Sequence, residues 1–316
     1  MPDHRHATEG RPPTIAHVVH SLGIGGAETL AAGLARQLHG SYRFVFLCLD
    51  DAGPLAEALR ARGIAVEILK RRPGLDLPVA HRLAGAVHRH RVDLLHTHQY
   101  TPFFYAAVSR ALRPGPTLIF TEHGRHQPDH RTIRRVATNR LLLRRSDRIT
   151  AVGRAVRDAL VRHEGLAARR VQVIPNGIDP GTFGSAAARQ ARSAVRRELG
   201  LTGAHPVAVQ VARFHPVTDH ATAIRAMKQV VQRIPRAVLV VVGDGPQRAA
   251  LETMVAGAGL GPHVRVLGLR RDVLCRPDAR KRMGDEGRQG LIAHFTQKQM
   301  HERVSRLYDQ MLNQRA

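Results

Sequence analysis

Short runs of β-branched and apolar residues alternate with amphipathic helical stretches from Thr14 onward. A strand, a helix and a second strand parallel to the first form the repeating unit of open α/β sheets, so this alternation predicts a parallel sheet covered by helices on both faces. Strands are predicted at residues 14–20, 42–50, 64–70, 93–99, 117–123, 148–152 and 171–175, with helices in the gaps between them.

A turn-rich segment at 175–184, PNGIDPGTFG, interrupts this alternation, because its Pro, Gly, Asn and Asp residues favour turns over helix or strand. After a helix that ends near Leu199, three more strands are predicted at 206–213, 236–245 and 264–269, and the chain beyond Val273 is polar and helical. We therefore predict a disordered tail at 1–13, an N-terminal Rossmann-like domain at 14–178, a partial C-terminal Rossmann-like domain at 179–273, and C-terminal helices at 274–316.

The charge of the chain raises the question of an anionic partner, since 49 Lys and Arg stand against 25 Asp and Glu, a formal net charge of +24. Half of this excess lies in residues 1–180, so no basic tail or basic domain stands out, and aromatic residues make up only 4% with no Trp. Nucleic-acid binding is not expected, because a basic stripe and aromatic stacking platforms are both unsupported.

Cys48 and Cys275 are the only cysteines, which excludes a disulfide framework and a cysteine metal site. The first residues hold no apolar signal-peptide core, and no later stretch approaches the ~18 apolar residues of a membrane-spanning helix. The expected location is the cytoplasm, with any membrane contact peripheral and at the inner face.

The first candidate binding segment is SLGIGGAET, where Gly23, Gly25 and Gly26 lie between the first strand and the next helix. Glycines there let a phosphate approach the helix N-terminus, although a tight turn that packs helix on sheet explains them equally well. The segment is not a dinucleotide fingerprint, because Glu28 occupies the third glycine position, but Asp50 does end the next strand as that motif requires. An NAD(P)-dependent oxidoreductase therefore stays open as a distant alternative.

Histidines at predicted strand ends form the second candidate. Strand alternation puts His96 and His98 on one face, and His123, His126 and His130 have helix-like spacing, so a metal site is conceivable. Twenty histidines make such pairs common by chance, so no metal is predicted. At the carboxyl end of a parallel strand, a neutral His123 could hydrogen-bond a substrate hydroxyl; a surface loop histidine is the alternative.

Two further segments follow predicted strands of the second domain. Arg213 ends the strand in VARFHPVTDH, where a guanidinium suits bidentate contact with a diphosphate. Gly243 and Gly245 form the Gly-Asp-Gly turn of VVVGDGP, which is open to a ligand or is a plain turn.

The basic stretch at 131–148 has Ile133, Val136, Ala137 and Leu141 at helical spacing. An interfacial helix that touches anionic lipid headgroups has this composition, and so does a solvated helix face in an Arg-rich protein.

These elements, in this order, resemble the retaining glycosyltransferases of family 4, which have the GT-B fold of two Rossmann-like domains. The resemblance covers almost the whole chain and rests on GIGGAET, TEHG, SDRITAVGRAVRDAL, VIPNGIDPGTF, ARFHPVTDH, VVVGDGP, LCRPDARKRMGDEGR and HFTQKQMHERVSRLYDQML. It implies sugar transfer with retention from a nucleotide sugar, UDP- or GDP-linked, to a polysaccharide, lipid-linked or small-molecule acceptor, without a metal or other cofactor.

The resemblance also implies roles for individual residues. Gly25 and Gly26 would meet the donor diphosphate, and Arg213 would neutralise the same phosphates as they leave. His123 would lie near the transferred sugar and the acceptor. The nucleoside pocket would be lined by Gly243, Gly245 and Leu267.

Two departures from the family pattern matter for activity. Thr218 stands where the family has a lysine five residues after the phosphate arginine, and a hydroxyl brings no charge to the departing diphosphate, an expected loss of roughly several kcal/mol. The family's E-x7-E segment is absent between Val273 and Leu274, so about two to three βαβ units are missing and the second domain is truncated. The strand at 206–213 would then lie at an uncovered sheet edge. A catalytically impaired remnant is therefore the main alternative to an active enzyme.

Overall fold

The computed structural model describes residues 11–124, 133–179, 186–268 and 292–314. The chain divides into two compact units, which are described separately: unit 1 comprises residues 1–178 and 293–316, and unit 2 comprises residues 179–292. The last helix of the chain thus belongs to the same unit as the first strand.

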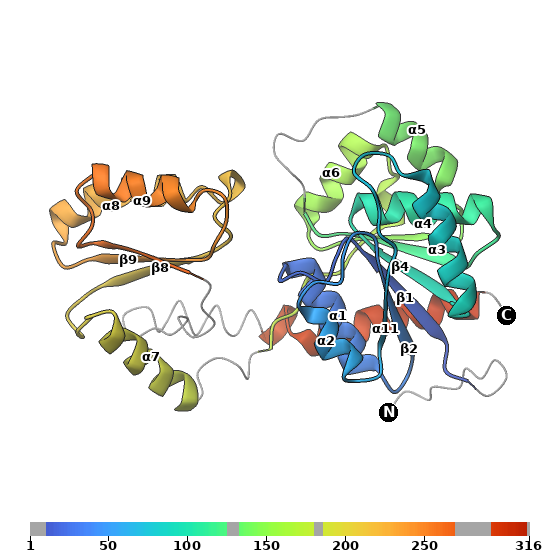
Figure 1. Ribbon diagram of the computed structural model, residues 1–316, viewed down its shortest axis with the longest axis horizontal. Helices are drawn as coiled ribbons and strands as arrows, with labels where there is room; N and C mark the ends of the chain where they lie inside the picture. Colours follow the sequence, from blue (N-terminus) through green and yellow to red (C-terminus); the bar gives the residue numbers. More distant parts are fainter. Residues whose placement is uncertain (1–10, 125–132, 180–185, 269–291, 315–316) are drawn as a thin grey trace. The chain divides into compact units, whose positions relative to one another are not determined.

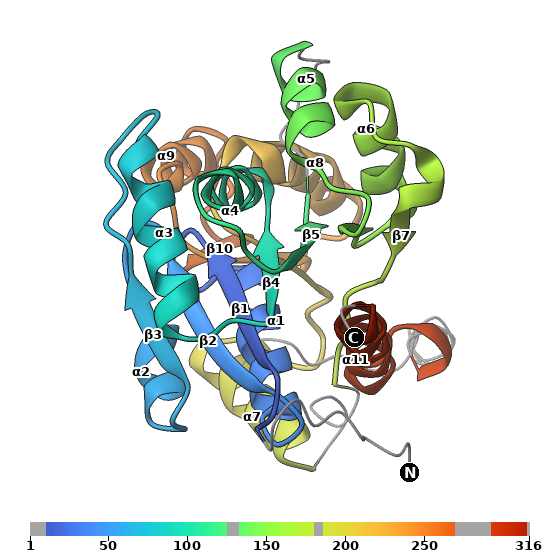
Figure 2. The same ribbon diagram turned by 90° about the vertical axis from the view of Figure 1, so that its right-hand side faces the viewer.

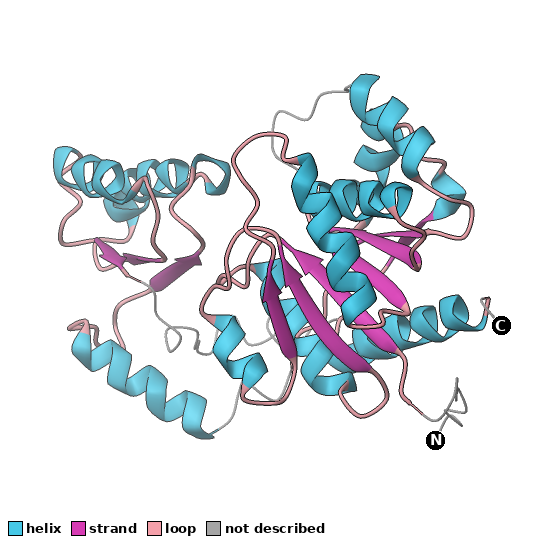
Figure 3. Ribbon diagram, turned by 45° about the vertical axis from the view of Figure 1, so that its right-hand side comes forward, coloured by secondary structure: helices cyan, strands magenta, loops and turns pink. Residues whose placement is uncertain are grey.

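Unit 1 is built on a seven-stranded parallel sheet of strand order β3-β2-β1-β4-β5-β6-β7 (Figures 1 and 3). Each predicted strand of this region is present. Their bounds are β1 Thr14–Val19, β2 Arg43–Cys48, β3 Ala65–Ile68, β4 Leu94–His98, β5 Thr117–Glu122, β6 Arg148–Ala151 and β7 Val171–Val173. All pairs are parallel, so the carboxyl ends of the strands meet at one edge of the sheet.

Helices cover both faces of this sheet because successive side chains of a buried strand point to opposite sides and both sides are apolar here. One face packs against α3 (Leu77–Arg89), α4 (Tyr100–Leu112) and α6 (Arg154–Glu164), and α5 (Ile133–Leu142) lies beside α6. The other face packs against α1 (Gly26–Leu38), α2 (Leu55–Arg60) and α11 (Gln297–Asn313). Figure 2 shows α11 end-on, on the side of the sheet opposite α4.

Helix α11 docks on unit 1 through one apolar stripe. Its buried side chains recur every three or four residues, and they are Met300, His301, Val304, Leu307, Tyr308 and Met311. Thr296 and Gln299 close a capping box at its N-terminus. Just before the helix, the chain runs beside Ile178, whose N–H donates to the carbonyl of Phe295 at 2.9 Å. The two segments that join unit 1 to unit 2 are therefore paired with each other.

Unit 2 contains a three-stranded parallel sheet of order β10-β9-β8. Its strands are β8 Val207–Val211, β9 Val238–Val242 and β10 Val264–Leu267. Helices α8 (His220–Arg233) and α9 (Arg248–Gly257) cover one face, and α7 (Ala186–Glu198) covers the other (Figure 1). Among the described residues β8 pairs only with β9, which confirms the predicted edge position of this strand.

Within the described ranges, no helix combines the length and the apolar character that crossing a membrane requires.

Candidate active site

The glycine-rich turn lies between β1 and the N-terminus of α1. Gly25 is the N-cap of α1 in extended conformation, and no side chain caps the helix. A Cβ on Gly26 would meet no atom within 4 Å, so the approach to the first turn is open there. Two backbone hydrogen bonds fix Leu22, the residue before the turn: Leu22 N–H donates to the carbonyl of Ala52 (3.1 Å), and Leu55 N–H donates to the carbonyl of Leu22 (3.0 Å). The Glu28 carboxylate lies against Gly25, so an anion could approach this helix start only from the side of Gly26.

Asp50, two residues after β2, binds to other side chains of unit 1. The side chain of Arg71 donates from Nε to Asp50 Oδ1 at 2.8 Å, and His20 Nδ1 lies 3.1 Å from Oδ2. Partial burial raises the pKa of Asp50, but the hydrogen bonds from Arg71 and His20 outweigh it and leave the pKa below its usual range. The carboxylate therefore has a structural partner, and the structure supplies no separate reason to assign it to a ribose hydroxyl.

A row of imidazoles crosses the sheet of unit 1 on the α11 face. His17 of β1 lies with its Nδ1 2.8 Å from Nε2 of His98 on β4, and His98 Nδ1 lies 2.9 Å from Nε2 of His123, just after β5. We call these three residues the imidazole row. His17 and His98 are buried, while His123 is half-buried at the carboxyl edge of the sheet. The predicted position of His123 at a strand's carboxyl end is what the structure shows.

His96, the register partner of His17, is joined to a different set of groups. Its Nδ1 lies 2.6 Å from the hydroxyl of Tyr308 on α11, and its Nε2 lies 2.8 Å from the hydroxyl of Thr121, which contacts Thr150. His96 and His98 share one face of β4, as their spacing predicts. His126 and His130 lie outside the described residues.

Burial keeps these imidazoles neutral. It lowers the pKa of His17, His96 and His98 well below the usual value, and neighbouring imidazoles lower it further. Burial also lowers the pKa of His123 to about 4. Each ring therefore carries one N–H and one lone pair near pH 7.

Ring nitrogens of His17, His96 and His98 all lie within 4.8 Å of one another, a grouping that could hold a metal ion. Among these three, the sequence pattern indicated His96 and His98 as candidate ligands but not His17. It did not indicate the contact of His96 with Tyr308 either. His17 alternates with Ile15 and Val19 on the buried face of β1, but which histidine it meets depends on the pairing of β1 with β4, about 80 residues later. The prediction that no metal is used remains a prediction.

In unit 2, the remaining candidates gather at the carboxyl edge of the sheet. Arg213 follows β8 and is exposed, Gly243 and Gly245 follow β9, and Leu267 ends β10 with its carbonyl 3.4 Å from the N–H of Gly243. The structure therefore brings together the four residues that the sequence connected with the diphosphate and the nucleoside.

The two glycines have a packing reason of their own. Gly243 and Gly245 have φ of 153° and 152°, which side-chain-bearing residues rarely adopt. A Cβ on Gly243 would overlap the carbonyl of Ala212, and one on Gly245 would come within 2.6 Å of the carbonyl of Phe214. Close packing against the backbone after β8 therefore requires glycine at both positions, with or without a bound ligand.

Thr218 is held by the same loop. Its hydroxyl lies 2.7 Å from the carbonyl oxygens of both Arg213 and His215, and it can donate its single proton to either. His220 Nε2 lies 3.2 Å from the Arg213 carbonyl as well. Thr218 therefore fixes the backbone of the loop that carries the exposed guanidinium, a role that needs no charge.

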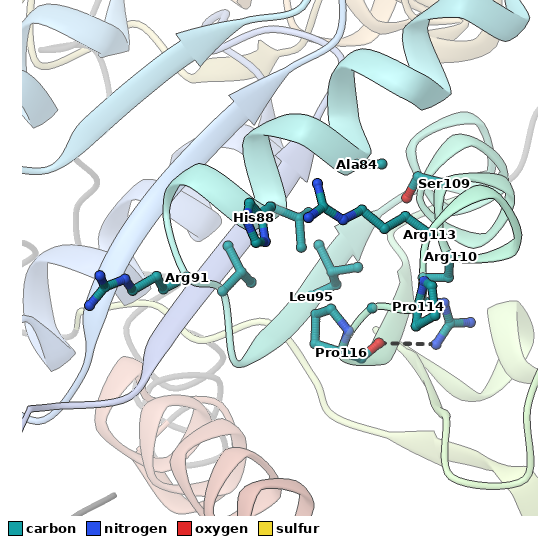
Figure 4. A pocket seen from close by; sticks show the side chains of 12 residues that line it. Ala84, His88, Arg91, Leu95, Ser109, Arg110, Arg113, Pro114 and Pro116 are labelled. Carbon is teal, nitrogen blue, oxygen red and sulfur yellow. Dashed lines mark hydrogen bonds between the residues drawn. The ribbon is translucent and has the colours of Figure 1, made fainter. Parts of the chain in front are cut away.

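A cavity of about 610 Å³ opens at the opposite edge of the unit 1 sheet, between the C-terminal ends of α3 and α4 (Figure 4). Arg110, in its wall, donates to the carbonyl of Pro116 and is buried against Asp147 with N–O distances of 2.7 and 2.8 Å. Open α/β sheets bind ligands at the carboxyl ends of their strands, so this cavity is not the predicted donor site.

The basic helix α5 divides its apolar residues between two environments. Ile133 and Leu141 are 82% and 84% exposed, whereas Val136 is half-buried and would contact a side chain at Gly165. Arg135 pairs with Glu164 at 3.0 Å. The solvent-facing surface of α5 thus carries two large apolar side chains among arginines.

Known proteins match this arrangement over both units. Residues 24–182 match Glycosyltransferase Family 4, and residues 191–274 match Glycosyl transferases group 1. EpsF of Bacillus subtilis (strain 168), provisionally named a glycosyltransferase, is 25% identical over 264 residues, which cover 80% of this chain and 68% of EpsF. A GDP-mannose-dependent alpha-(1-6)-phosphatidylinositol monomannoside mannosyltransferase of Mycolicibacterium smegmatis is 32% identical over 119 residues, 38% of this chain and 30% of that enzyme.

A crystal structure of Anabaena Alr3699/HepE in complex with UDP and glucose superposes with a TM-score of 0.68 at 21% identity, over 82% of this chain and 70% of that one. Two parallel sheets in two units, matched to such structures, define a protein of the GT-B fold. The chain belongs to glycosyltransferase family 4.

Proposed function

We propose that this chain transfers a sugar, with retention of configuration, from a UDP- or GDP-linked donor to a polysaccharide, lipid-linked or small-molecule acceptor. The observation that carries the proposal is the gathering of Arg213, Gly243, Gly245 and Leu267 at one carboxyl edge of unit 2. Unit 1 supplies an open helix start at Gly26 at the carboxyl end of its own sheet.

These groups would act by electrostatic stabilisation of the departing nucleoside diphosphate. As the glycosidic bond to the nucleoside diphosphate breaks, negative charge grows on the phosphate oxygens, and an exposed guanidinium such as that of Arg213 can bind two of them at once. The backbone N–H groups at the start of α1 add partial positive charge without any ionisable group. A neutral His123 can hydrogen-bond a sugar oxygen, and no step of this scheme requires a metal.

The relatives support both donor classes. The Mycolicibacterium enzyme is named as GDP-mannose-dependent and acts on a phosphatidylinositol mannoside, and HepE was crystallised with UDP and glucose. Leu267 and the Gly243 turn offer apolar and backbone contacts that suit a nucleoside without selecting its base.

Donor binding is tested by thermal melts of the purified chain with UDP, GDP and their sugar conjugates, because a ligand that binds only the folded state raises the melting temperature. One nucleoside diphosphate should stabilise the wild type, and Arg213→Ala should lose most of that shift. Arg236→Ala is the matched control, since Arg236 is equally exposed but precedes β9 at the opposite edge of the same sheet. Stabilisation by NAD or NADP instead would favour the oxidoreductase alternative.

A catalytically impaired remnant is the competing proposal, motivated by Thr218 and by the segment missing after Val273. Transfer of radiolabelled sugar to cell-envelope extract by the wild-type chain would exclude it. If the wild type shows no transfer activity, Thr218→Lys together with an inserted family segment between Val273 and Leu274 should create it. A wild-type chain that binds the donor but does not transfer the sugar would support the proposal of an impaired remnant.

The exposed surface of α5 supports a peripheral contact with anionic membrane, which would bring a lipid-linked acceptor within reach. Sedimentation with phosphatidylglycerol vesicles should fall when Ile133 and Leu141 are both changed to Asp. The control pair Arg134→Gln and Arg140→Gln separates loss of apolar insertion from loss of charge, because the second pair should weaken binding mainly at low salt.

A further inference from the structure

Among the described residues, each end of the imidazole row is a ring nitrogen without a hydrogen-bond partner. Within the part of the chain that the structure describes, His17 Nε2 and His123 Nδ1 are both buried and make no hydrogen bond, while the four nitrogens between them form two hydrogen bonds of 2.8 and 2.9 Å. The ring planes lie at 17° and 29° to one another, with centroids 5.1 Å apart at each step. The row is therefore closed to outside partners everywhere except at its two ends.

The protons of such a row cannot be placed independently. A neutral imidazole has one N–H and one lone pair, so a hydrogen bond between two rings requires a donor on one side and an acceptor on the other. Two arrangements satisfy both bonds. In the first, all three rings carry the proton on Nδ1, and His123 presents an N–H. In the second, all three carry it on Nε2, and His123 presents a lone pair.

The surroundings of His17 distinguish these arrangements. Its ring stacks on Phe44 and Phe46, with centroids 5.5 and 5.0 Å away, and the residue is fully buried. Buried N–H groups without an acceptor are rarer in proteins than buried acceptors without a donor. Both end nitrogens are unpartnered among the described residues, so either arrangement leaves one N–H without an acceptor. A bound ligand can supply an acceptor only at the carboxyl edge of the sheet, because His123 is partly exposed there and His17 is fully buried. The arrangement that leaves a lone pair on His17 Nε2 is therefore favoured, and it puts an N–H on Nδ1 of His123.

We propose that His17 and His98 are positioning residues that hold His123 in its Nδ1–H tautomer, so that His123 donates a hydrogen bond to an oxygen of the bound sugar instead of accepting a proton from it. This inference rests on the proposed function for its substrate. The tautomer itself is a property of the chain alone, which allows the two to fail separately.

The first measurement is the ¹⁵N NMR spectrum of the full chain with labelled histidine at pH 7.5, in which two-bond couplings identify the protonated nitrogen of each ring. We expect Nδ1–H on all three residues of the row, each assigned from the signal lost in its own substitution. An Nε2–H tautomer at His123 overturns the proposal. So does stoichiometric zinc in the purified protein, because a metal would occupy the lone pairs that the row needs.

Two substitutions of His17 then separate positioning from packing. The side-chain amide of His17→Asn can still donate from the place of Nδ1, whereas His17→Leu fills the site without a donor. We expect Asn to keep the wild-type tautomer of His123 and Leu to release it into a mixture. In transfer assays His17→Leu should lower kcat/KM roughly tenfold, the effect of about one hydrogen bond, and His17→Asn should restore most of it. Equal losses in both variants would reduce His17 to a packing residue, and wild-type NMR decides the tautomer even if His17→Leu does not fold.

Discussion

The two units both contain a parallel sheet covered by helices, but the described strands number seven in unit 1 and three in unit 2. In unit 1, β1 has a strand on each side and all six of its residues are buried, whereas in unit 2 the equally apolar β8 pairs on one side among the described residues and Val211 is 48% exposed. Both sheets nevertheless place their candidate ligand groups at the carboxyl edge. Among the described residues, the candidate ligand groups of unit 2 therefore lie on a sheet of three strands and those of unit 1 on a sheet of seven.

Amide exchange gives the largest contrast that this comparison predicts. The amides of β1 open only with the whole of unit 1, because the strand is hydrogen-bonded on both sides, whereas those of β8 need far less disruption. Hydrogen-exchange mass spectrometry at neutral pH should find β8 peptides roughly 100-fold or more faster than β1 peptides. Equal protection of the two strands would mean that other contacts cover β8.

Breaking the buried ion pair of unit 1 tests whether the units unfold separately. Arg110→Ala leaves Asp147 charged and buried without its partner and should cost about 3–5 kcal/mol. The measurement is urea unfolding followed by exchange in β1 and in β9. Loss of protection in both strands would show that the two units unfold as one, and Arg145→Ala, at an exposed site nearby, is the control for charge.

Acid should destabilise unit 1 selectively. The imidazole row and His96 have pKa values below those of the unfolded chain, so as pH falls below about 6.5 the unfolded state binds protons first and stability is lost, down to about pH 4 for His123. Each imidazole that stays neutral costs about 1.4 kcal/mol per pH unit in this range. The free energy of unfolding, measured with urea at pH 7.5, 6.5 and 5.5, should fall with a slope that corresponds to the uptake of two or more protons. His98→Gln should make this slope smaller. A wild-type stability that does not change with pH would contradict the burial of neutral rings.

Glycine substitutions compare the two edges directly. Gly243→Ala should destabilise unit 2 by about 1–3 kcal/mol, because it adds an overlap with the Ala212 carbonyl at a φ of 153°. Gly26→Ala should leave stability within about 0.5 kcal/mol and yet weaken donor binding, since the proposed donor phosphate would lie in its open space. Thermal melts with and without nucleoside diphosphate resolve the two, and the idea fails if both variants lose stability alike.

The smallest expected effect is at Thr218. Thr218→Val removes the hydroxyl that bonds to the Arg213 and His215 carbonyls and should cost unit 2 about 1 kcal/mol. Thr218→Ser keeps the bond and should be near neutral. Chemical unfolding of the two variants side by side provides the check, and indistinguishable midpoints would remove Thr218 from the loop's support.

Local pattern predicted the strands of both sheets, the edge position of β8 and the strand-end position of His123, because each depends on nearby residues or on the order of βαβ units. What it missed depends on distant pairing. His17 meets His98 through the register of β1 with β4, and His96 meets Tyr308 only because α11 returns to unit 1 some 200 residues later. The packing requirement for glycine at position 243 could not be predicted either, because a side chain there would overlap backbone after β8, a different part of the sequence.

The pairing of Ile178 with the segment before α11 makes unit 2 an insertion into unit 1. During synthesis, unit 1 cannot cover its α11 face until α11 has left the ribosome, and unit 2 is synthesised before α11, so unit 2 has the opportunity to fold first. Unit 2 also begins and ends at neighbouring positions of unit 1. Its length can therefore change, by gain or loss of strands, without a change in the strand pairing of the unit 1 sheet. Changes in the length of unit 2 can therefore leave the sheet of unit 1 intact.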